Sequence, residues 1–170
     1  YDGIVQAHNK FLVGRLGNFV NRNLSCIVKK LDGKSNKGKI DSGIINFTKQ
    51  TFKDVGNHIE NGEIRKATSA IFEYISLGNK FYDSKQPWKQ VKEDLSAFYD
   101  TTYTCIYMMA NISNLIAPIL PDASKKIKKM LNLPEYKWEE ELITSDLQVE
   151  DLVLLYERID EPKSNDAINR

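Results

Sequence analysis

The feature that most constrains the fold is a helical period of apolar residues near the start of the chain. Apolar side chains recur there at steps of three and four, at Leu12, Leu16, Phe19, Val20, Leu24, Ile27, Val28 and Leu31. This spacing places them on one broad face of an α-helix. We therefore predict one long helix over residues 4–31, whose apolar face other elements must cover.

The opposite side of this predicted helix carries a narrow polar stripe, formed by Arg15, Asn18, Arg22, Ser25 and Lys29. A helix that only had to be soluble would usually combine Glu with Lys on such a face, but this stripe has no acid. Asn offers a donor and an acceptor, and Arg offers a planar fork of donors. Asn18 and Arg22 lie one turn apart, so the pair suits the edge of a nucleotide base or a phosphate.

The same periodicity predicts four further helices, over residues 42–60, 63–83, 88–117 and 121–132. Pro87 suits the first turn of the third of these and not the interior of the helix before it. No convincing strand or repeat appears. The predicted fold is all-α, an antiparallel bundle of about five helices over residues 1–132. Residues 133–170 would form an extended or partly helical tail that packs back on the bundle or on a missing domain.

Charge is unevenly placed along the 170 residues. The net charge of +1 argues against a protein coated in nucleic acid, yet the first 40 residues are basic. Residues 139–161 contain nine acids against Arg158 alone, and we interpret the run at 139–141 as a solvated face. Residues 32–39 form a predicted flexible basic loop, either a solvated connector or a segment that faces phosphate.

The sequence contains no signature of a catalytic or metal site. It has no phosphate-binding glycine loop, nucleophile elbow, or zinc-protease motif. Two cysteines and two distant histidines do not suggest a disulfide scaffold or a zinc site, and we assign Cys105 to the core. No apolar run is long enough to span a membrane, and no signal peptide is present. Because the chain begins in mid-pattern without Met, we interpret it as a fragment of a larger cytosolic protein.

Trp88 follows Pro87 in a polar loop, where a large aromatic side chain has little local reason to be. It could cap the end of the bundle. Alternatively it could be a stacking platform for an unstacked base, an interaction worth roughly 1–3 kcal/mol. The polar stripe favours the second reading, because the end of a bundle brings its loops beside neighbouring helices.

Four segments, in order, resemble the anticodon-binding helical bundle of methionyl-tRNA synthetases. Residues 16–22 (LGNFVNR) look like the family's opening signature, and residues 78–89 (GNKFYDSKQPWK) resemble its segment of an aromatic pair followed by Pro-Trp. Residues 117–121 (APILP), followed by an amphipathic helix and Trp138, resemble its Pro-aliphatic-Pro turn. Residues 154–159 (LLYERI) are similar to its closing segment, although Tyr156-Glu157 stands where the family commonly has Phe-Pro.

The resemblance implies a function for three residues already singled out. In that family the Trp of the Pro-Trp pair stacks on an anticodon base, and the Asn and Arg of the opening signature contact the anticodon, chiefly the C of CAU. The matching positions here are Trp88, Asn18 and Arg22. Contacts to the tRNA backbone are expected from Arg15, Lys29, Lys34 and Lys37, with Lys39 in the same loop.

The resemblance also implies a longer parent enzyme. A separate catalytic domain in cis would use ATP, with magnesium, to activate methionine and load it on the tRNA. Its signatures are absent here, so this chain would be inactive alone, with no cofactor, catalytic residue or metal of its own. Two alternatives stay open: the same bundle from another class I synthetase, and a protein-interaction bundle without RNA binding.

Overall fold

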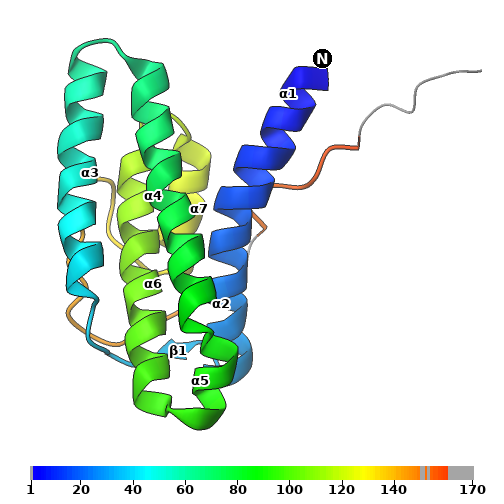
Figure 1. Cartoon of the computed structure of the whole chain (residues 1–170), viewed down its shortest axis with the longest axis vertical. Coiled ribbons are helices and arrows are strands. Elements are labelled where there is room, and N and C mark those ends of the chain that lie inside the picture. Colours follow the sequence, from blue (N-terminus) through cyan, green and yellow to red (C-terminus); the bar gives the residue numbers. More distant parts are fainter. Residues whose placement is uncertain (1, 150–151, 153, 161–170) are drawn as a thin grey trace, which may run out of the picture.

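The computed structural model describes residues 2–149, 152 and 154–160, and it confirms an all-α bundle (Figure 1). The helical elements are α1 (Asp2–Ala7), η1 (His8–Gly17), α2 (Asn18–Leu31), α3 (Ser42–Glu60), α4 (Ile64–Lys85), α5 (Pro87–Glu93), α6 (Leu95–Ile116) and α7 (Pro121–Met130). Two short strands, β1 (Lys34–Ser35) and β2 (Leu147–Gln148), pair antiparallel, with Lys34 opposite Gln148. The expectation of no strand was therefore wrong at one small place. Among the described residues, no helix combines the length and apolar character needed to cross a membrane.

The first three helical elements form one continuous helix, as predicted for residues 4–31, which bends between α1 and α2 (Figure 1). Its middle part, η1, is a π-helix. Gly14 and Gly17 suit this wider turn. A Cβ at either position would lie only 3.1 Å from the carbonyl oxygen five residues earlier, that of Asn9 or Leu12. Glycine thus relieves crowding within the segment's own backbone.

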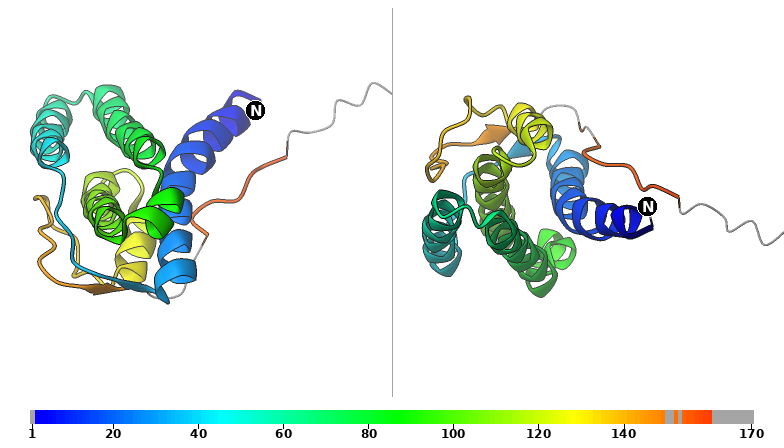
Figure 2. Two further views of the ribbon diagram at one scale, coloured as in Figure 1. Left: turned by 60° about the horizontal axis from the view of Figure 1, so that its bottom comes forward. Right: turned by 90° about the horizontal axis from the view of Figure 1, so that it is seen from above.

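Helix α6 is the centre of the bundle. All its residues from 101 to 116 are buried, and it packs against α2, α3, α4, α5 and α7 (Figure 2). Cys105 is fully buried there, which confirms its assignment to the core. Because α6 is covered on every side, its apolar residues are less periodic than those of a surface helix.

The predicted single helix over residues 88–117 is wrong, since Asp94 divides it into α5 and α6. Asp94 has extended backbone angles, φ −150° and ψ 91°, and its carboxylate accepts a hydrogen bond from the Ala97 amide at 3.0 Å. It is thus the N-cap of α6. Pro87 occupies the first turn of α5, as predicted, after Gln86 with its positive φ of 51°. The short α5 consequently crosses the end of the bundle (Figure 1).

The segment after α7 runs along the bundle and adds Ile143, Val149 and Leu155 to the buried core. The interpretation of residues 139–141 as a solvated face is wrong for two of its members. Glu140 accepts a hydrogen bond from the Tyr107 hydroxyl at 2.6 Å, and Glu141 is 6% exposed. Further along, the Asn9 side chain exchanges two hydrogen bonds with the backbone of Ile159, at 2.8 and 2.9 Å. Residues 161–170 of the predicted tail lie outside the described residues.

Candidate nucleic-acid interface

The interface begins with the close packing of α2 against α4. At Gly78 a Cβ would lie 2.8 Å from two ring atoms of Phe19, closer than real Cβ atoms come. Only glycine therefore lets the two helices meet at this level. The approach brings the residues after Gly78 on α4 against the polar stripe of α2.

Arg22 is held by α4 on three sides. Its Nη1 donates to the Asp83 carboxylate at 2.9 Å, and its Nη2 donates to the Asn79 carbonyl at 2.8 Å. The guanidinium carbon lies 4.2 Å from the centre of the Tyr82 ring, a cation–π contact. The Nε atom has no hydrogen-bond partner among the described residues. At Arg22 the polar stripe therefore borders the neighbouring helix α4, and only 24% of the Arg22 side chain is exposed to solvent.

Asn18 lies one turn before Arg22 and is exposed. Its amide nitrogen is 3.5 Å from the side-chain oxygen of Asn79, and the Asn79 amide donates in turn to the Arg15 carbonyl at 3.2 Å. Asn79 therefore joins Asn18 and Arg22 into one polar cluster. Most of the donor and acceptor capacity of Asn18 stays open to a ligand.

Trp88, on the first turn of α5, is 45% exposed. Its ring centroid lies 5.8 Å from that of Tyr82, tilted by 45°. The same Tyr82 ring carries Arg22, so α4 brings Trp88 and Arg22 together. Nearly half of the Trp88 surface is available for stacking.

Tyr82 is the buried support of this cluster, with 7% of its surface exposed. Burial raises the pKa of its hydroxyl. Burial likewise raises the pKa of the Cys26 thiol, although a hydrogen bond with Tyr82 acts the other way. Both groups are therefore neutral at physiological pH, and the positive charge of the cluster comes from Arg22.

The basic residues expected near phosphate are spread over η1, α2 and the following loop. The Arg15 guanidinium lies over the Phe11 ring at 4.9 Å, and Lys29 is exposed on the last turn of α2. Lys34 is 3.8 Å from the Asp146 carboxylate, which also accepts the Lys37 backbone amide at 2.7 Å. The loop predicted to be flexible is thus held at Lys34 and Lys37 by Asp146, and at Lys39, whose amide donates to Asp100 at 2.7 Å.

Sequence reasoning did not single out Asn79, Tyr82 and Asp83 as the neighbours of the site. Their spacing of three and four was the available signal, since such residues share one face of a helix. Among the described residues, no group of three or more His, Cys, Asp or Glu side chains could hold a metal ion.

Comparison with known proteins decides the family. The sequence profile of the anticodon-binding domain of methionyl-tRNA ligase matches residues 32–153, more than half of the chain. The chain belongs to this family. The match includes Trp88 and Asn79 of the anticodon-binding domain, whereas Asn18 and Arg22 lie before its first residue.

Relatives with known names agree with this assignment. The methionine–tRNA ligases of Bacillus cereus (strain 03BB102) and Bacillus anthracis (strain A0248) are each 36% identical over 156 residues, which are 92% of this chain and 28% of those proteins. The chain thus spans little more than a quarter of the length of the curated relatives it matches. The resemblance seen in the sequence is confirmed at the level of the family.

Solved structures agree on the fold. The free form of Mycobacterium tuberculosis methionyl-tRNA synthetase matches 95% of this chain with a TM-score of 0.85 at 22% identity, using 35% of that chain. The same synthetase in complex with methionyl-adenylate matches 78% of this chain with a TM-score of 0.74 at 26% identity, using 28% of that chain. The anticodon-binding domain described here therefore has the bundle fold seen in a methionyl-tRNA synthetase.

Proposed function

We propose that this domain recognises the CAU anticodon of the methionine-acceptor tRNA through Trp88, Asn18 and Arg22. The observation that carries the proposal is the meeting of these three side chains around one turn of α4. Trp88 and Arg22 share Tyr82, and Asn18 and Arg22 share Asn79. An aromatic face, an amide and a guanidinium on one surface are the groups that RNA-binding proteins use on splayed bases.

Each residue has a distinct role in the proposed complex. Trp88 would hold an unstacked base by its face, an interaction worth about 1–3 kcal/mol. Asn18 would pair with the polar edge of the C, since its exposed amide offers both a donor and an acceptor. Arg22, fixed by Asp83 and Tyr82, would bring charge and a pre-oriented donor set to the same base.

The cations around the site would contact phosphates of the anticodon stem and loop. The proposal assigns this role to Arg15, Lys29, Lys34 and Lys37. Each phosphate neutralised releases counterions, so the affinity should fall as salt rises. These contacts position the RNA and carry no base preference of their own.

In the proposed parent enzyme, a catalytic domain in the same polypeptide would charge the tRNA with methionine in the cytoplasm. ATP with magnesium would be used there, and this domain alone would be inactive and would bind no cofactor. The relatives support this proposal by their names, which are those of methionine–tRNA ligases. One of the structural relatives is described with methionyl-adenylate, the product of methionine and ATP.

The proposal is tested by a chemical-shift titration of this chain with a CAU anticodon stem-loop. A stem-loop with GAU in place of CAU, at the same salt, is the matched control. We expect the side-chain signals of Trp88, Asn18 and Arg22 to shift with CAU and much less with GAU. Equal binding of the two loops would reject readout of the C, and no shift at low salt would favour a protein-interaction bundle.

A further inference from the structure

A cavity of about 880 Å³ lies against α7, away from the candidate anticodon site. Its walls come from the turn after α6, from one face of α7 and from the segment 133–136. Seen from above, α7 and α5 lie on opposite sides of α6 (Figure 2). The cavity is within the usual range of ligand pockets, about 300–1,000 Å³, and it is separate from Trp88.

Three lysines of α7 give this cavity a positive wall. Lys125, Lys128 and Lys129 line it, and Glu135 is the one acid of its lining among the described residues. Lys125 and Lys129 are exposed and lie one helical turn apart, so their side chains share a face. Neither has an ion pair within the described part of the chain. Both ammonium groups can therefore bind the same anion.

Lys128 differs from these two lysines, because it is only 6% exposed. Its Nζ donates to Asn114 Oδ1 of α6 at 2.6 Å, and burial lowers its pKa, although the Glu141 carboxylate acts the other way. Glu141 is itself paired with Lys137 at 3.7 Å, so it compensates Lys128 only in part. A buried charge is screened less than an exposed one. Lys128 therefore adds to the attraction for an anion from behind the wall.

The rest of the lining is mostly apolar and includes an aromatic ring. Three prolines and Leu133 line the cavity, and proline has a fixed φ, so these walls have little freedom to collapse. Tyr136, at the end of the segment, is 48% exposed. An exposed tyrosine ring offers a face on which a flat ring can stack. The cavity thus combines a place for an anion with a place for an aromatic group.

We propose that the cavity on α7 binds an aromatic phosphate of nucleotide size, such as a nucleoside monophosphate. Its phosphate would lie between Lys125 and Lys129, with Lys128 behind them, and its ring would pack on Tyr136. A phosphate monoester carries up to two negative charges, which suit a wall of three lysines better than the single charge of a carboxylate does. The proposal goes beyond anticodon recognition, because none of these residues belongs to the site around Trp88.

The test is an NMR titration of the whole chain with adenosine 5′-monophosphate (AMP). Adenosine and inorganic phosphate, at the same salt, are run beside it. We expect AMP to shift the signals of Lys125, Lys129 and Tyr136. Adenosine and inorganic phosphate should each bind about tenfold more weakly than AMP or worse, because each offers only one half of the ligand.

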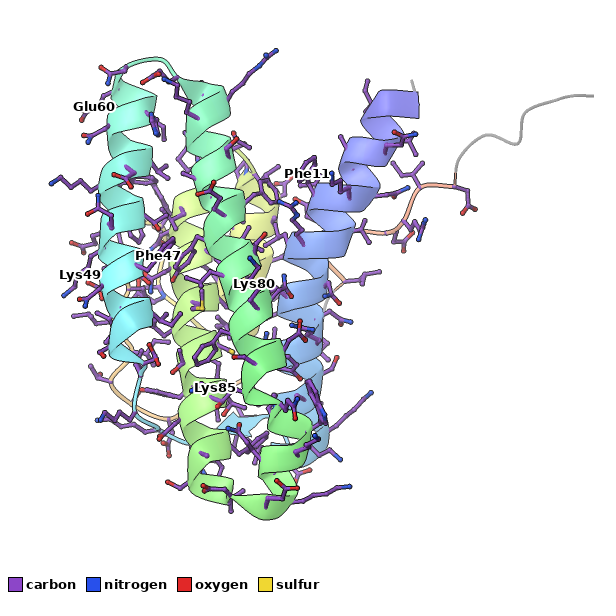
Figure 3. The ribbon with its side chains drawn as sticks, in the orientation of Figure 1. Phe11, Phe47, Lys49, Glu60, Lys80 and Lys85 are labelled. Carbon is purple, nitrogen blue, oxygen red and sulfur yellow. The ribbon has the colours of Figure 1, made fainter. Side chains whose placement is uncertain are left out.

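Two variants locate the site. Lys125→Gln combined with Lys129→Gln should weaken AMP binding by about tenfold, the scale of a lost charge-assisted contact. Tyr136→Ala should weaken it by about fivefold, the scale of a lost stack. All three side chains are exposed, so these changes leave the core intact. Lys80→Gln combined with Lys85→Gln is the matched control and should change nothing, since both lysines are on α4, in front of α7 in Figure 3.

Four results would overturn the proposal. Shifts at Trp88, Asn18 and Arg22 in place of Tyr136 would show that AMP occupies the candidate anticodon site. Inorganic phosphate that binds as tightly as AMP, or a double lysine variant that binds AMP like the wild-type chain, would reject the site. Displacement of AMP from Tyr136 by a CAU stem-loop would assign the lysines to RNA. If AMP does not bind, the cavity on α7 is not such a site, while the proposed recognition of CAU stands.

Discussion

The two tryptophans make a close comparison, because both lie at the surface and both lean on another aromatic ring. Trp88 is 45% exposed and Trp138 is 37% exposed. The rings of Trp88 and Tyr82 are 5.8 Å apart, and those of Trp138 and Phe52 are 5.4 Å apart. Exposure and aromatic packing therefore do not distinguish the two sites.

Their surroundings differ. The Tyr82 ring, which packs against Trp88, also contacts the Arg22 guanidinium, and the exposed Asn18 amide lies one helical turn from Arg22. Trp138 contacts α3 near Gly56 and is followed in the chain by acids. Trp88 thus has the charge and hydrogen-bond neighbours that a base requires, whereas Trp138 pins the segment after α7 to the bundle. A surface aromatic residue marks an RNA site only together with such neighbours.

The largest effect should come from removing the proposed platform. Trp88→Ala should weaken binding of the CAU stem-loop by about 1–3 kcal/mol, the value of a lost base stack. Trp138→Ala should leave the affinity unchanged, because the Trp138 ring packs on Phe52 of α3 and not on the cluster of Arg22, Asn18 and Tyr82. Fluorescence anisotropy of a labelled stem-loop measures both. Equal losses in the two variants would contradict the distinction.

The packing beneath the Trp88 site can be tested next. Gly78→Ala should lower the free energy of unfolding by about 1–3 kcal/mol, since the new methyl group overpacks against Phe19. Gly3→Ala is the matched control. No atom lies within 4 Å of a Cβ at Gly3, so the change should stabilise α1 slightly. Urea unfolding measures the free energy of both variants. A Gly78→Ala variant as stable as the wild-type chain would contradict the predicted clash with Phe19.

Stability should reverse the ranking of the two tryptophans. Trp138→Ala should cost about 1.5 kcal/mol, less than a fully buried aromatic residue because more than a third of it is exposed. Trp88→Ala should cost less, because more of its surface already contacts water. Thermal unfolding monitored by circular dichroism measures this difference. A greater loss for Trp88→Ala would identify Trp88 as a structural cap of the bundle.

The smallest expected effect concerns the acid that holds Arg22. Asp83 is 61% exposed in its ion pair with Arg22, so Asp83→Asn should cost under about 1 kcal/mol of stability at low salt. The loss should shrink at high salt. Glu73→Gln on the same helix is the control, because Glu73 has no ion pair among the described residues. A cost that does not change with salt would show that Asp83 acts through packing.

Several elements could be predicted from the sequence because their signals are local. Helix α3 begins and ends where its period predicts, at residues 42 and 60, and Pro87 begins α5. The division at Asp94 was missed because the apolar period continues across it, although Asp is a common N-cap. The pairing of β1 with β2 joins residues over a hundred positions apart, which no local pattern reveals.

The residues of the candidate site likewise fall into those with a local sequence signal and those that only the tertiary structure identifies. Asn18, Arg22 and Trp88 could be named because a stripe without acids and a tryptophan in a polar loop are visible in the sequence. Tyr82, which carries both Arg22 and Trp88, could not be ranked above its neighbour Phe81, since both fit the apolar period of α4. A polar cavity lined by Gln90 was not foreseen, because its walls come from the segment 39–41 and from four separate helices, α3, α4, α5 and α6.

The sequence by itself determined most of the helices, the family resemblance and the types of side chain at the proposed anticodon site, because periodicity and motifs are properties of neighbouring residues. The tertiary structure decided that the Arg22 side chain packs against α4, that Trp88 lies beside Tyr82, and that Glu141 is buried. These depend on which helices approach one another and how closely. The contact of Gly78 with Phe19 sets that distance for α2 and α4. These two residues are far apart in the chain and come into contact only when the bundle folds.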